Sequence, residues 1–406
     1  MSWSTLPVRR IFRVVNGGTP TADESNWGGD VPWATPVDIG AAGACLSATQ
    51  RTLTMAGAVG GSRIVPEGSI LLSTRAPIGY VTQTAVPMAF NQGCRALIST
   101  RALDVRFFVY QLGAMESQLQ AKGQGTTFLE LSSEALAAMV VTVPPLDEQR
   151  RIADFLDAET ARIDLLLGKR RRMGDLLTLR RERITEQVLG LEEGHSTPLV
   201  PLKYLVHEVS VGIVVTPAKW YVDDGGVPAL RGLNVQPGRI LPENLVYISN
   251  SGHAENLKSR LKAGDVVVVR TGQAGAAAVV PRELDGVNCI DLIIVRPGKK
   301  VDPSYVTYVL NSDYAKGQVG LNSVGSIQAH FNVGAMKQLP IPAVSRSEQA
   351  AKVAILDREI GSMNALSERL AAQDRLLKER RQALITAAVT GQLDVTTARP
   401  AHDRDL

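Results

Sequence analysis

Two long stretches of the chain carry hydrophobic side chains at spacings that alternate between three and four residues. One runs from about residue 147 to residue 189, and the other begins near residue 345. This alternation places a stripe of apolar residues along an α-helix and is typical of a coiled-coil seam. The seam positions are Ile163, Leu166, Arg170, Met173, Leu177, Arg180 and Ile184 in the first stretch and Met363, Leu366, Leu370, Gln373, Leu377, Arg380 and Leu384 in the second. We therefore predict two helices of about 44 residues, each about 65 Å long at 1.5 Å per residue, stabilised by burying their seams.

The rest of the chain has a different pattern, in which short apolar runs are separated by turn-forming residues. Examples are Ser69–Leu72 and Met139–Val143, in a segment rich in Gly, Pro, Thr and Val. Runs of this length between turns are typical of β-strands. We expect a mixed globular module with several strands and a few short helices before the first long helix.

The two halves of the chain resemble copies of one another. Glu148-Gln149 recurs as Glu348-Gln349, an offset of 200 residues. The same offset relates Leu156-Asp157 to Leu356-Asp357, Glu159 to Glu359, Leu176-Leu177 to Leu376-Leu377, Arg180-Arg181 to Arg380-Arg381 and Gly125 to Gly325. Upstream, pairs at 196 or 198 residues are Gly68 and Gly264, Gly79 and Gly275, Phe107 and Tyr305, and Tyr110 and Tyr308. The repeating unit is therefore a globular module followed by a long helix.

This repeat predicts an α+β protein with two similar mixed α/β modules separated by two long antiparallel coiled-coil helices. The second helix has to return beside the first to bury both seams, which implies an internal pseudo-two-fold. The predicted segments are a first module at 1–146, a first spacer helix at 147–194, a second module at 195–344, a second spacer helix at 345–393 and a flexible tail at 394–406.

Composition restricts the function classes only weakly. The 406 residues contain 44 Lys and Arg against 40 Asp and Glu, and this net charge of +4 permits a polyanionic partner without requiring one. Cys45, Cys94 and Cys289 form no CxxC pair and fit a reducing compartment. No apolar run reaches the ~20 residues of a membrane span, and the start lacks a signal-peptide core. We expect a cytoplasmic protein with no membrane partner.

The sequence lacks the motifs of common catalytic sites. It has no Gly-x-x-x-x-Gly-Lys-Ser/Thr phosphate loop, no Gly-x-Gly-x-x-Gly after a strand, and no Asn/Asp-Pro-Pro-Tyr/Phe of an amino-methyltransferase. None of the five histidines is spaced to bind a metal together with another His or Cys. We predict no catalytic, cofactor-binding or metal site in this chain.

Two similar modules held apart by helices suit a target that has two-fold symmetry of its own. Duplex DNA has two-fold axes perpendicular to its length, so each module can contact one half-site in inverted orientation. Because the modules differ in sequence, the half-sites would also differ. The expected target is an asymmetric DNA sequence with a gap whose length the helices set.

Several motifs resemble the DNA-specificity subunit of type I restriction-modification systems. They are Gly17-Gly18-Thr19-Pro20 followed by Val31-Pro32-Trp33, the run Leu71–Gly79, the run Val143–Ile152 and the closing run Ala387–Leu393, and they span nearly the whole chain in order. The second copy departs from the pattern at Ile341–Val344 and Val269–Gly272. The resemblance implies that the modules are target-recognition domains and that the helices are conserved regions on which methyltransferase subunits dock.

The same resemblance implies the partners of a non-catalytic subunit in a methyltransferase and endonuclease complex. These are double-stranded DNA, two modification (methyltransferase) subunits and, in systems that have them, two restriction (translocase and nuclease) subunits. S-adenosylmethionine would be bound by the methyltransferase partner, and ATP and Mg would be bound by the restriction subunit.

Arginines and lysines near turns are the candidate DNA contacts, because arginine both binds phosphate and reads guanine edges. Arg75 follows a strand-like run and precedes Pro77 and Gly79, and Arg270 lies one place from the aligned position in the second copy. For each, an ordinary surface arginine is the alternative. The further candidates are Arg63, Arg95, Arg231, Lys258, Arg260 and Lys262.

Two other conspicuous groups are interpreted as structural. The basic run Lys169–Arg172 is interpreted as a solvated helix face, because acidic residues on the same helix would repel phosphate. Trp27, Trp33 and Trp220 are interpreted as packing residues rather than as platforms for an extruded base.

Two functions from other classes stay open. A coiled-coil scaffold would bind proteins through its modules, and its affinity for DNA would not fall with salt. A complete methyltransferase would need a cofactor pocket, which the missing motifs do not supply. The sequence also leaves open the recognised bases, the gap length and whether a restriction subunit accompanies the methyltransferase.

Overall fold

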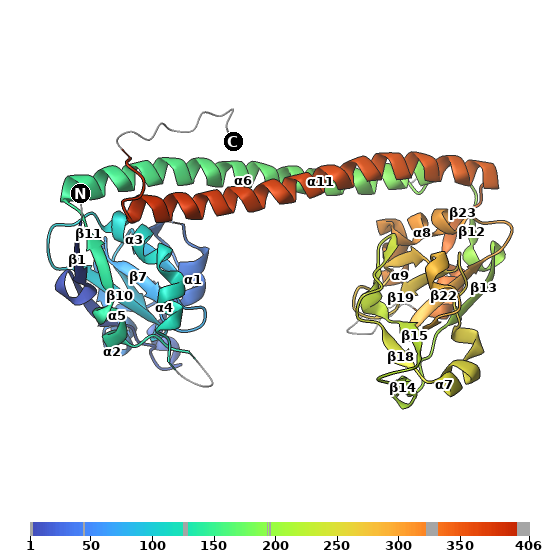
Figure 1. Ribbon diagram of the computed structural model, residues 1–406, viewed down its shortest axis with the longest axis horizontal. Coiled ribbons are helices and arrows are strands. Elements are labelled where there is room, and N and C mark those ends of the chain that lie inside the picture. The colour runs from blue at the N-terminus through green and yellow to red at the C-terminus, as the bar shows by residue number, and fades with distance from the viewer. Residues whose placement is uncertain are drawn as a thin grey trace. The chain divides into compact units, whose positions relative to one another are not determined.

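The computed structural model of the chain describes residues 3–43, 45–124, 129–192, 194, 196–321 and 332–395. The repeat pair Gly125 and Gly325 and the tail from residue 396 onward lie outside these residues. The chain divides into two compact units, of which unit 1 comprises Met1–Arg170 and Ala372–Leu406, and unit 2 comprises Arg171–Ala371. Each unit contains a mixed-sheet domain and part of both long helices (Figure 1). The five-segment division of the chain remains a prediction.

The domain of unit 1 is built on a main sheet of largely antiparallel strands. Its strands, in spatial order, are β2 (Phe12–Asn16), β10 (Cys94–Ser99), β7 (Ile70–Ser73), β8 (Val81–Thr84) and β4 (Cys45–Leu46). A smaller sheet contains β5 (Thr52–Leu53), β3 (Trp27–Ala34), β9 (Met88–Phe90) and β6 (Ile64–Val65), and β1 (Ser4–Pro7) pairs with β11 (Val140–Val143). The helices are α1 (Pro36–Ala41), α2 (Met55–Gly61), α3 (Val105–Ala114), α4 (Glu116–Ala121) and α5 (Ser133–Ala138), with 3-10 turns η1 (Val8–Arg10) and η2 (Glu24–Asn26).

The domain of unit 2 has the same plan. Its main sheet has the order β13 (Val206–Val211), β22 (Leu292–Pro297), β19 (Val266–Val269) and β20 (Ala277–Val279), and its smaller sheet has the order β14 (Tyr221–Val222), β18 (Val246–Ile248), β15 (Val227–Leu230) and β21 (Asn288–Cys289). The remaining pairs are β12 (Leu199–Pro201) with β23 (Pro340–Pro342) and β16 (Val235–Gln236) with β17 (Arg239–Ile240). The helices are α7 (Asn250–Glu255), α8 (Pro303–Asn311), α9 (Asp313–Leu321) and α10 (Val333–Gln338), with 3-10 turns η3 (Leu202–Tyr204), η4 (Pro217–Trp220), η5 (Gly232–Asn234), η6 (Leu257–Ser259) and η7 (Arg282–Leu284).

The two topologies confirm the internal repeat. The strand order β2-β10-β7-β8 recurs as β13-β22-β19-β20, and the flanking pair β1-β11 recurs as β12-β23. In each smaller sheet one pair of strands is parallel, namely β3 with β9 and β15 with β21. The predicted α+β class, with two mixed-sheet domains and two long helices packed together, is therefore confirmed.

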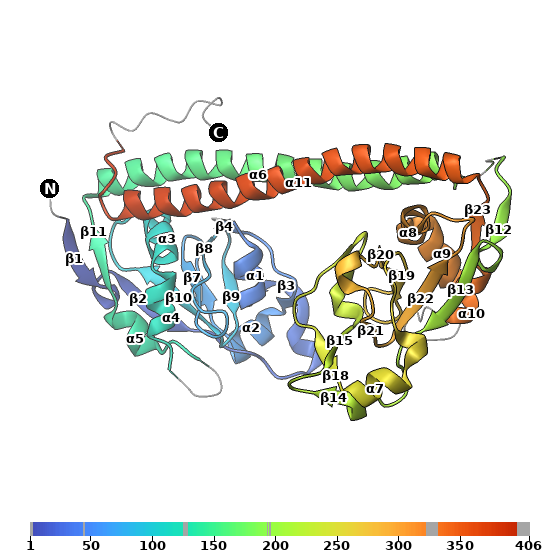
Figure 2. The same ribbon diagram turned by 45° about the vertical axis from the view of Figure 1, so that its right-hand side comes forward.

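The long helices are α6 (Leu146–Leu189) and α11 (Arg346–Val389), each of 44 residues, and they lie side by side in both views (Figures 1 and 2). In unit 1 the guanidinium of Arg381 lies 3.3 Å from the carboxylate of Asp164, and Arg170 hydrogen-bonds Gln373. Residues that advance along α6 meet residues that recede along α11, so the two helices run antiparallel.

The predicted seam is only partly correct. Ile163, Met363 and Leu377 are buried, whereas Met173 is 42% exposed and Arg180 is also exposed. A straight helix has 3.6 residues per turn, so a 3.5-residue repeat drifts around it by about 20° per heptad. The predicted stripe therefore contacts α11 at Ile163 and Arg170 but leaves the contact surface at Met173 and Arg180.

Both long helices contribute to the core of each domain. In unit 1 the cluster around Phe107 and Phe108 includes residues from α6 and from α11, which are Ile152, Ala153, Leu156, Ile385, Ala388 and Val389. In unit 2 the cluster around Tyr305 includes Leu189 of α6 and Leu356 of α11. Each domain is thus packed against the helix that follows it and against the far end of the other helix.

Candidate DNA interface

Arg75 and Arg95, two of the candidate DNA contacts, are joined by one carboxylate. Glu130 accepts a hydrogen bond from Nε of Arg75 at 3.0 Å and one from a terminal nitrogen of Arg95 at 3.1 Å. Arg75 follows β7, and its side chain is 48% exposed, whereas Arg95 lies in β10 with only 11% of its side chain exposed. Arg95 also donates to Ser133 and to the carbonyls of Gln92 and Cys94. Arg75 is therefore the more accessible arginine of the two, and the largely buried Arg95 holds Glu130 in place.

Arg270 in unit 2 is held in a comparable way. It follows β19, and its terminal nitrogen donates to Asp291 at 2.6 Å, while the hydroxyl of Thr271 donates to the other oxygen of Asp291 at 2.8 Å. Asp291 has φ of 52°, in the left-handed region, so its backbone is bent where β22 is about to begin. Each unit thus has an arginine after the third strand of its main sheet that is oriented by an acidic residue.

The remaining candidates lie at several places. Arg63 is exposed after α2 and donates to the carbonyl of Ser62. Arg231 follows β15 and donates to the carbonyl of Asn244 at 3.3 Å. A Cβ placed on Gly232 would lie 3.7 Å from the carbonyl oxygen of Thr271, so Arg231 and Arg270 follow strand ends that are near each other. These contacts bring two candidates of unit 2 to one edge of the domain.

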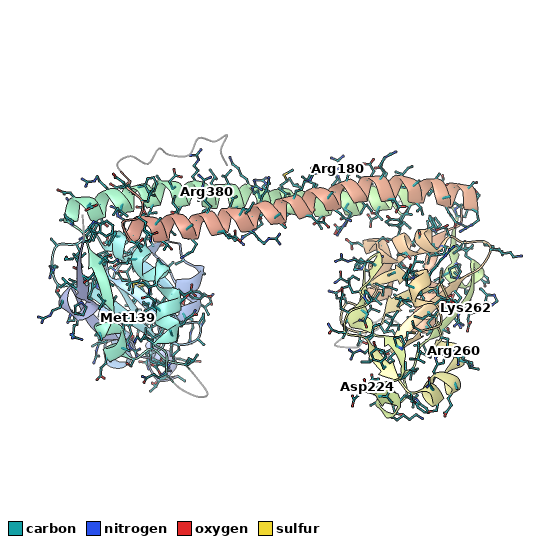
Figure 3. The ribbon with its side chains drawn as sticks, in the orientation of Figure 1. Met139, Arg180, Asp224, Arg260, Lys262 and Arg380 are labelled. Carbon is teal, nitrogen blue, oxygen red and sulfur yellow. The ribbon has the colours of Figure 1, made fainter. Side chains whose placement is uncertain are left out.

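Lys258, Arg260 and Lys262 form a second basic group in unit 2. Arg260 and Lys262 lie close together on the domain (Figure 3), and Lys258 and Lys262 are exposed. Arg296 supports the group from the sheet, because it donates to the backbone carbonyls of Lys258 and Arg260 at 3.0 Å each. The carboxylate of Glu208 lies 2.5 Å from Arg296 and neutralises it.

Sequence reasoning missed the acidic partners of these arginines. Glu130 is 55 residues from Arg75 in the chain, and Asp291 is 21 residues from Arg270. A backbone bridge between Arg75 and Glu130 brings the first pair together, and the pairing of β22 with β19 brings the second pair together. No periodicity in the sequence indicates such a contact.

The repeated Glu-Gln motif has a structural role at the joint between each domain and its helix. Oε1 of Gln149 accepts from the backbone N–H of Asp104 at 3.0 Å, and its Nε2 donates to the carbonyl of Pro144 at 2.8 Å. Gln349 repeats both contacts, with Asp302 at 2.7 Å and with Val344 at 2.9 Å. Both glutamines are buried. They tie the start of α6 or α11 to the N-cap residue of α3 or α8.

A tyrosine makes a second repeated link at each joint. The hydroxyl of Tyr110 in α3 donates to Asp157 of α6 at 2.7 Å, and that of Tyr308 in α8 donates to Asp357 of α11 at 2.6 Å. Burial raises the pKa of both tyrosines above the ordinary value, and the neighbouring aspartate raises it further. The hydroxyls therefore remain protonated donors at neutral pH.

An arginine distinguishes the first joint from the second. In unit 1 Arg106 contacts Asp104 at 2.7 Å, Asp154 at 2.8 Å and Asp157 at 2.7 Å. The hydrogen bond to Asp104 raises the pKa of Arg106 the most. Ser304 stands at the repeat-equivalent position in unit 2, so this charged cluster belongs to unit 1.

A hollow lies beside each tyrosine, and the two hollows are lined by equivalent residues. Each is bounded by the domain's helix, by the long helix that follows the domain and by the other long helix. The pairs related by the repeat are Tyr110 and Tyr308, Asp157 and Asp357, Thr160 and Ile360, Asp164 and Asn364, Arg381 and Arg181, and Gln382 and Glu182. The chain therefore offers the same kind of concave surface twice.

The long helices also expose apolar side chains. In unit 2, Met173, Leu176 and Leu179 of α6 are 42%, 58% and 61% exposed. Their spacing of three residues puts them on one side of the helix. In unit 1, Leu376 of α11, the repeat equivalent of Leu176, is 63% exposed. Contiguous exposed apolar residues of this kind are typical of protein-binding surfaces.

Within the described ranges, no group of three or more His, Cys, Asp or Glu side chains is arranged to hold a metal ion. The helices of the same ranges include none that is both long and apolar enough to cross a membrane.

Comparison with known proteins assigns the chain to a family. Residues 2–172 match the family described as type I restriction modification DNA specificity domain. The chain belongs to the specificity subunits of type I restriction-modification systems. The specificity subunit is the non-catalytic subunit that serves DNA target recognition.

Curated specificity subunits match different lengths of the chain. The MjaIX specificity subunit of Methanocaldococcus jannaschii is 32% identical over 180 residues, which cover 43% of this chain and 41% of that protein. The EcoBI specificity subunit of Escherichia coli is 22% identical over 349 residues, covering 79% and 72%. The chain thus spans about two fifths of the length of the MjaIX subunit.

Solved structures show the same fold over almost the whole specificity subunit. A chain from a study of complex assembly and conformational transition of the type I R-M system has a TM-score of 0.78 and 16% identity, covering 96% of this chain and 98% of that one. The HsdS subunit from Thermoanaerobacter tengcongensis has a TM-score of 0.53 and 17% identity, covering 96% and 97%.

Proposed function

We propose that this specificity subunit recognises a bipartite, gapped DNA sequence, with the domain of each unit reading one half-site. The duplicated domain topology is the observation that carries this proposal. The strand order β2-β10-β7-β8 recurs as β13-β22-β19-β20, whereas the residues at the strand ends differ: Ala76 and Pro77 follow Arg75, and Thr271 and Gly272 follow Arg270. A shared domain fold with different contact residues supports two DNA-binding domains with different base preferences. The side chains recognise the bases, and the fold only positions these side chains.

The candidate DNA contacts in this proposal are the basic residues identified from the sequence. Arg75, Arg270 and Arg231 are favoured, since they follow strand ends, and Lys258, Arg260 and Lys262 add positive charge in unit 2. Arg63 is exposed, and Arg95 supports Arg75 through Glu130. Phosphate contacts from such residues would make the affinity fall with salt.

The long helices are proposed to dock two methyltransferase subunits. The exposed Met173, Leu176 and Leu179 and the twin hollows support this part of the proposal. Because the two hollows lie at repeat-related places and share a tyrosine, an aspartate and an arginine in their linings, two copies of one partner could occupy them in the same way. S-adenosylmethionine would be bound by these subunits, while ATP and Mg would be bound by restriction subunits where the system includes them.

An exchange of one domain tests the bipartite reading. Residues 199–344 are replaced by the same domain of a relative, and the modified DNA of cells that express the complex is sequenced for methylated positions. One half-site should change while the other keeps its bases. A change in both half-sites, or in neither, would contradict the proposal that each domain reads independently.

A surface substitution tests the docking of the methyltransferase subunits. Leu176→Glu combined with Leu376→Glu should lower the mass of the complex measured by analytical ultracentrifugation, because the charges oppose burial against a partner. Thr178→Glu, an exposed change on a different side of α6, is the matched control. Full assembly of the double variant would exclude these positions from the docking surface.

A further inference from the structure

Arg51, between β4 and β5 in unit 1, is supported by tryptophan rather than by an acid. Its guanidinium carbon lies 3.6 Å from the centroid of the Trp27 ring and 5.6 Å from that of Trp33. The two tryptophan rings meet edge to face, with centroids 5.1 Å apart and planes at 88°. A cation placed over a tryptophan face in this way is held by the ring's electrostatic quadrupole.

The aromatic platform is fixed to the backbone. Nε1 of Trp27 donates to the carbonyl of Thr21 at 3.0 Å, and Nε1 of Trp33 donates to the carbonyl of Gly18 at 3.1 Å. The backbone N–H of Trp33 donates to the carbonyl of Arg51 itself at 3.1 Å. Trp33 is 4% exposed and belongs to the core around β3 and β9, next to α1 and α2 (Figure 2). The guanidinium is therefore held over a rigid base.

The donors of Arg51 are free, unlike those of Arg75, Arg270 and Arg296. Within the part of the chain that the structure describes, the exposed Arg51 guanidinium makes no hydrogen bond or ion pair. Arg75 is paired with Glu130, Arg270 with Asp291 and Arg296 with Glu208. Arg51 thus combines a fixed position with the unused hydrogen-bonding edge of a planar cation.

Unit 2 has a related feature on its corresponding sheet. Nζ of Lys219 lies 4.2 Å from the centroid of the Trp220 ring, and both residues belong to η4, just before β14 of the smaller sheet. Trp220 packs against the core formed by β15 and β18. A cation over a tryptophan therefore occurs on the smaller sheet of both domains.

We propose that Arg51 is a DNA-contacting residue of the first domain and that its free edge binds a pair of acceptor atoms on the duplex. A guanidinium offers two parallel N–H donors, and such pairs of acceptors occur on the guanine edge and on phosphate. Stacking on Trp27 already restricts the Arg51 side chain, so it loses less conformational entropy when it binds DNA. Contact by Arg51 is therefore favoured over contact by an arginine that is free to move. This inference rests on the proposed recognition of DNA by the domain of unit 1.

The test measures DNA binding by the complete complex containing Arg51→Ala, Arg51→Lys or the wild-type chain. Affinities are determined at several salt concentrations for the cognate site and for single-base variants of it. Arg101→Ala, which removes another exposed arginine of unit 1, is the matched control for lost charge. Thermal unfolding of each variant shows that the domain remains folded.

We expect Arg51→Ala to weaken binding to the cognate site by about tenfold or more, and Arg101→Ala to have a much smaller effect. A guanine contact would show as relaxed selectivity at one position of one half-site, which Arg51→Lys does not restore. A phosphate contact would show as equal weakening at all sites with a shallower salt dependence, which Arg51→Lys partly restores.

Equal affinities for Arg51→Ala and Arg101→Ala would overturn the inference and leave the proposed function intact. Failure of the wild-type complex to prefer any sequence would instead overturn the proposed function, and the role of Arg51 with it.

Discussion

Asp104 donates its backbone N–H to the side chain of Gln149, which follows 45 residues later in the chain. Asp104 is the N-cap residue of α3, where its own side chain accepts from the backbone N–H of Arg106. The glutamine therefore satisfies a backbone donor at a helix end while its amide nitrogen holds Pro144. The repetition of this contact by Asp302 and Gln349 explains why the glutamine of the Glu-Gln motif recurs in the sequence.

Gln149→Ala should destabilise the first domain by about 1–3 kcal/mol, because it leaves a buried N–H and a buried carbonyl without partners. The free energy of unfolding from urea titration measures the effect. Gln187→Ala, at an exposed glutamine of the same helix, should change stability by no more than about 0.5 kcal/mol. Equal effects of the two variants would show that the buried amide contributes nothing specific.

Tyr110 should make the stability of unit 1 sensitive to alkali. Burial raises its folded-state pKa above the ordinary value, which is about 10 in an unfolded chain. Its contribution is therefore complete below about pH 10 and is lost as the pH rises from there towards the folded pKa. Tyr110→Phe should flatten the loss of stability above pH 10 in thermal unfolding, although it also removes the hydrogen bond to Asp157. An unchanged slope above pH 10 for Tyr110→Phe would contradict this account.

Gly174→Ala should stabilise the protein by about 1 kcal/mol, because alanine has the higher helix propensity and restricts the unfolded chain. α6 continues through Gly174, and a Cβ there would meet nothing within 4 Å. Gly264 is equally open but has φ of 89°, so Gly264→Ala should destabilise instead. Thermal unfolding of both variants measures the two changes in stability. A destabilised Gly174→Ala chain would mean that the helix needs flexibility at this position.

Arg75→Ala tests whether the arginine that Glu130 orients contacts DNA. A base contact predicts a loss of about 1–3 kcal/mol confined to one position of a half-site, whereas a phosphate contact predicts uniform weakening and a shallower salt slope. Glu130→Gln should reproduce part of the same loss, since it releases the Arg75 side chain. Binding titrations that show unchanged affinity for Arg75→Ala at every salt concentration would remove this residue from the interface.

A heptad inserted into both long helices tests their proposed role as the spacer between half-sites. The insertion preserves the apolar register of each helix, so the variant should still recognise both half-sites, now separated by a longer gap. Sequencing of methylated positions in cells with the variant complex reads the new target. New half-site bases with the old gap would contradict the spacer role.

The sequence predicted the large-scale organisation because that organisation leaves a periodic signal. The two helices follow from the 3-4 spacing, and the duplicated domain follows from pairs such as Tyr110 and Tyr308. The side-chain contacts of the candidate interface leave no such signal. Glu130 reaches Arg75 through a backbone bridge between segments that are 55 residues apart, and the position of Arg51 over Trp27 depends on β5 lying beside β3.

The tryptophans show the same difference between what the sequence predicts and what it does not. Trp27 and Trp33 were predicted to pack, and they do contribute to the core around β3. Their second role as a support for a cation depends on the turn before β5, whose conformation is fixed by hydrogen bonds from Gln50 to Asp38 and from Thr49 to Arg51. Composition and spacing do not predict turn geometry of this kind.

The core shared with both long helices imposes an order of events during protein synthesis. Ile385, Ala388 and Val389 complete the apolar cluster of unit 1, and they leave the ribosome long after Leu156, the member of the cluster that precedes them in the chain. Until then, the first domain exposes the apolar surface that they cover. A truncation before residue 385 should therefore lower the yield of a domain encoded hundreds of codons upstream, and the nascent chain has to avoid aggregation until α11 is made.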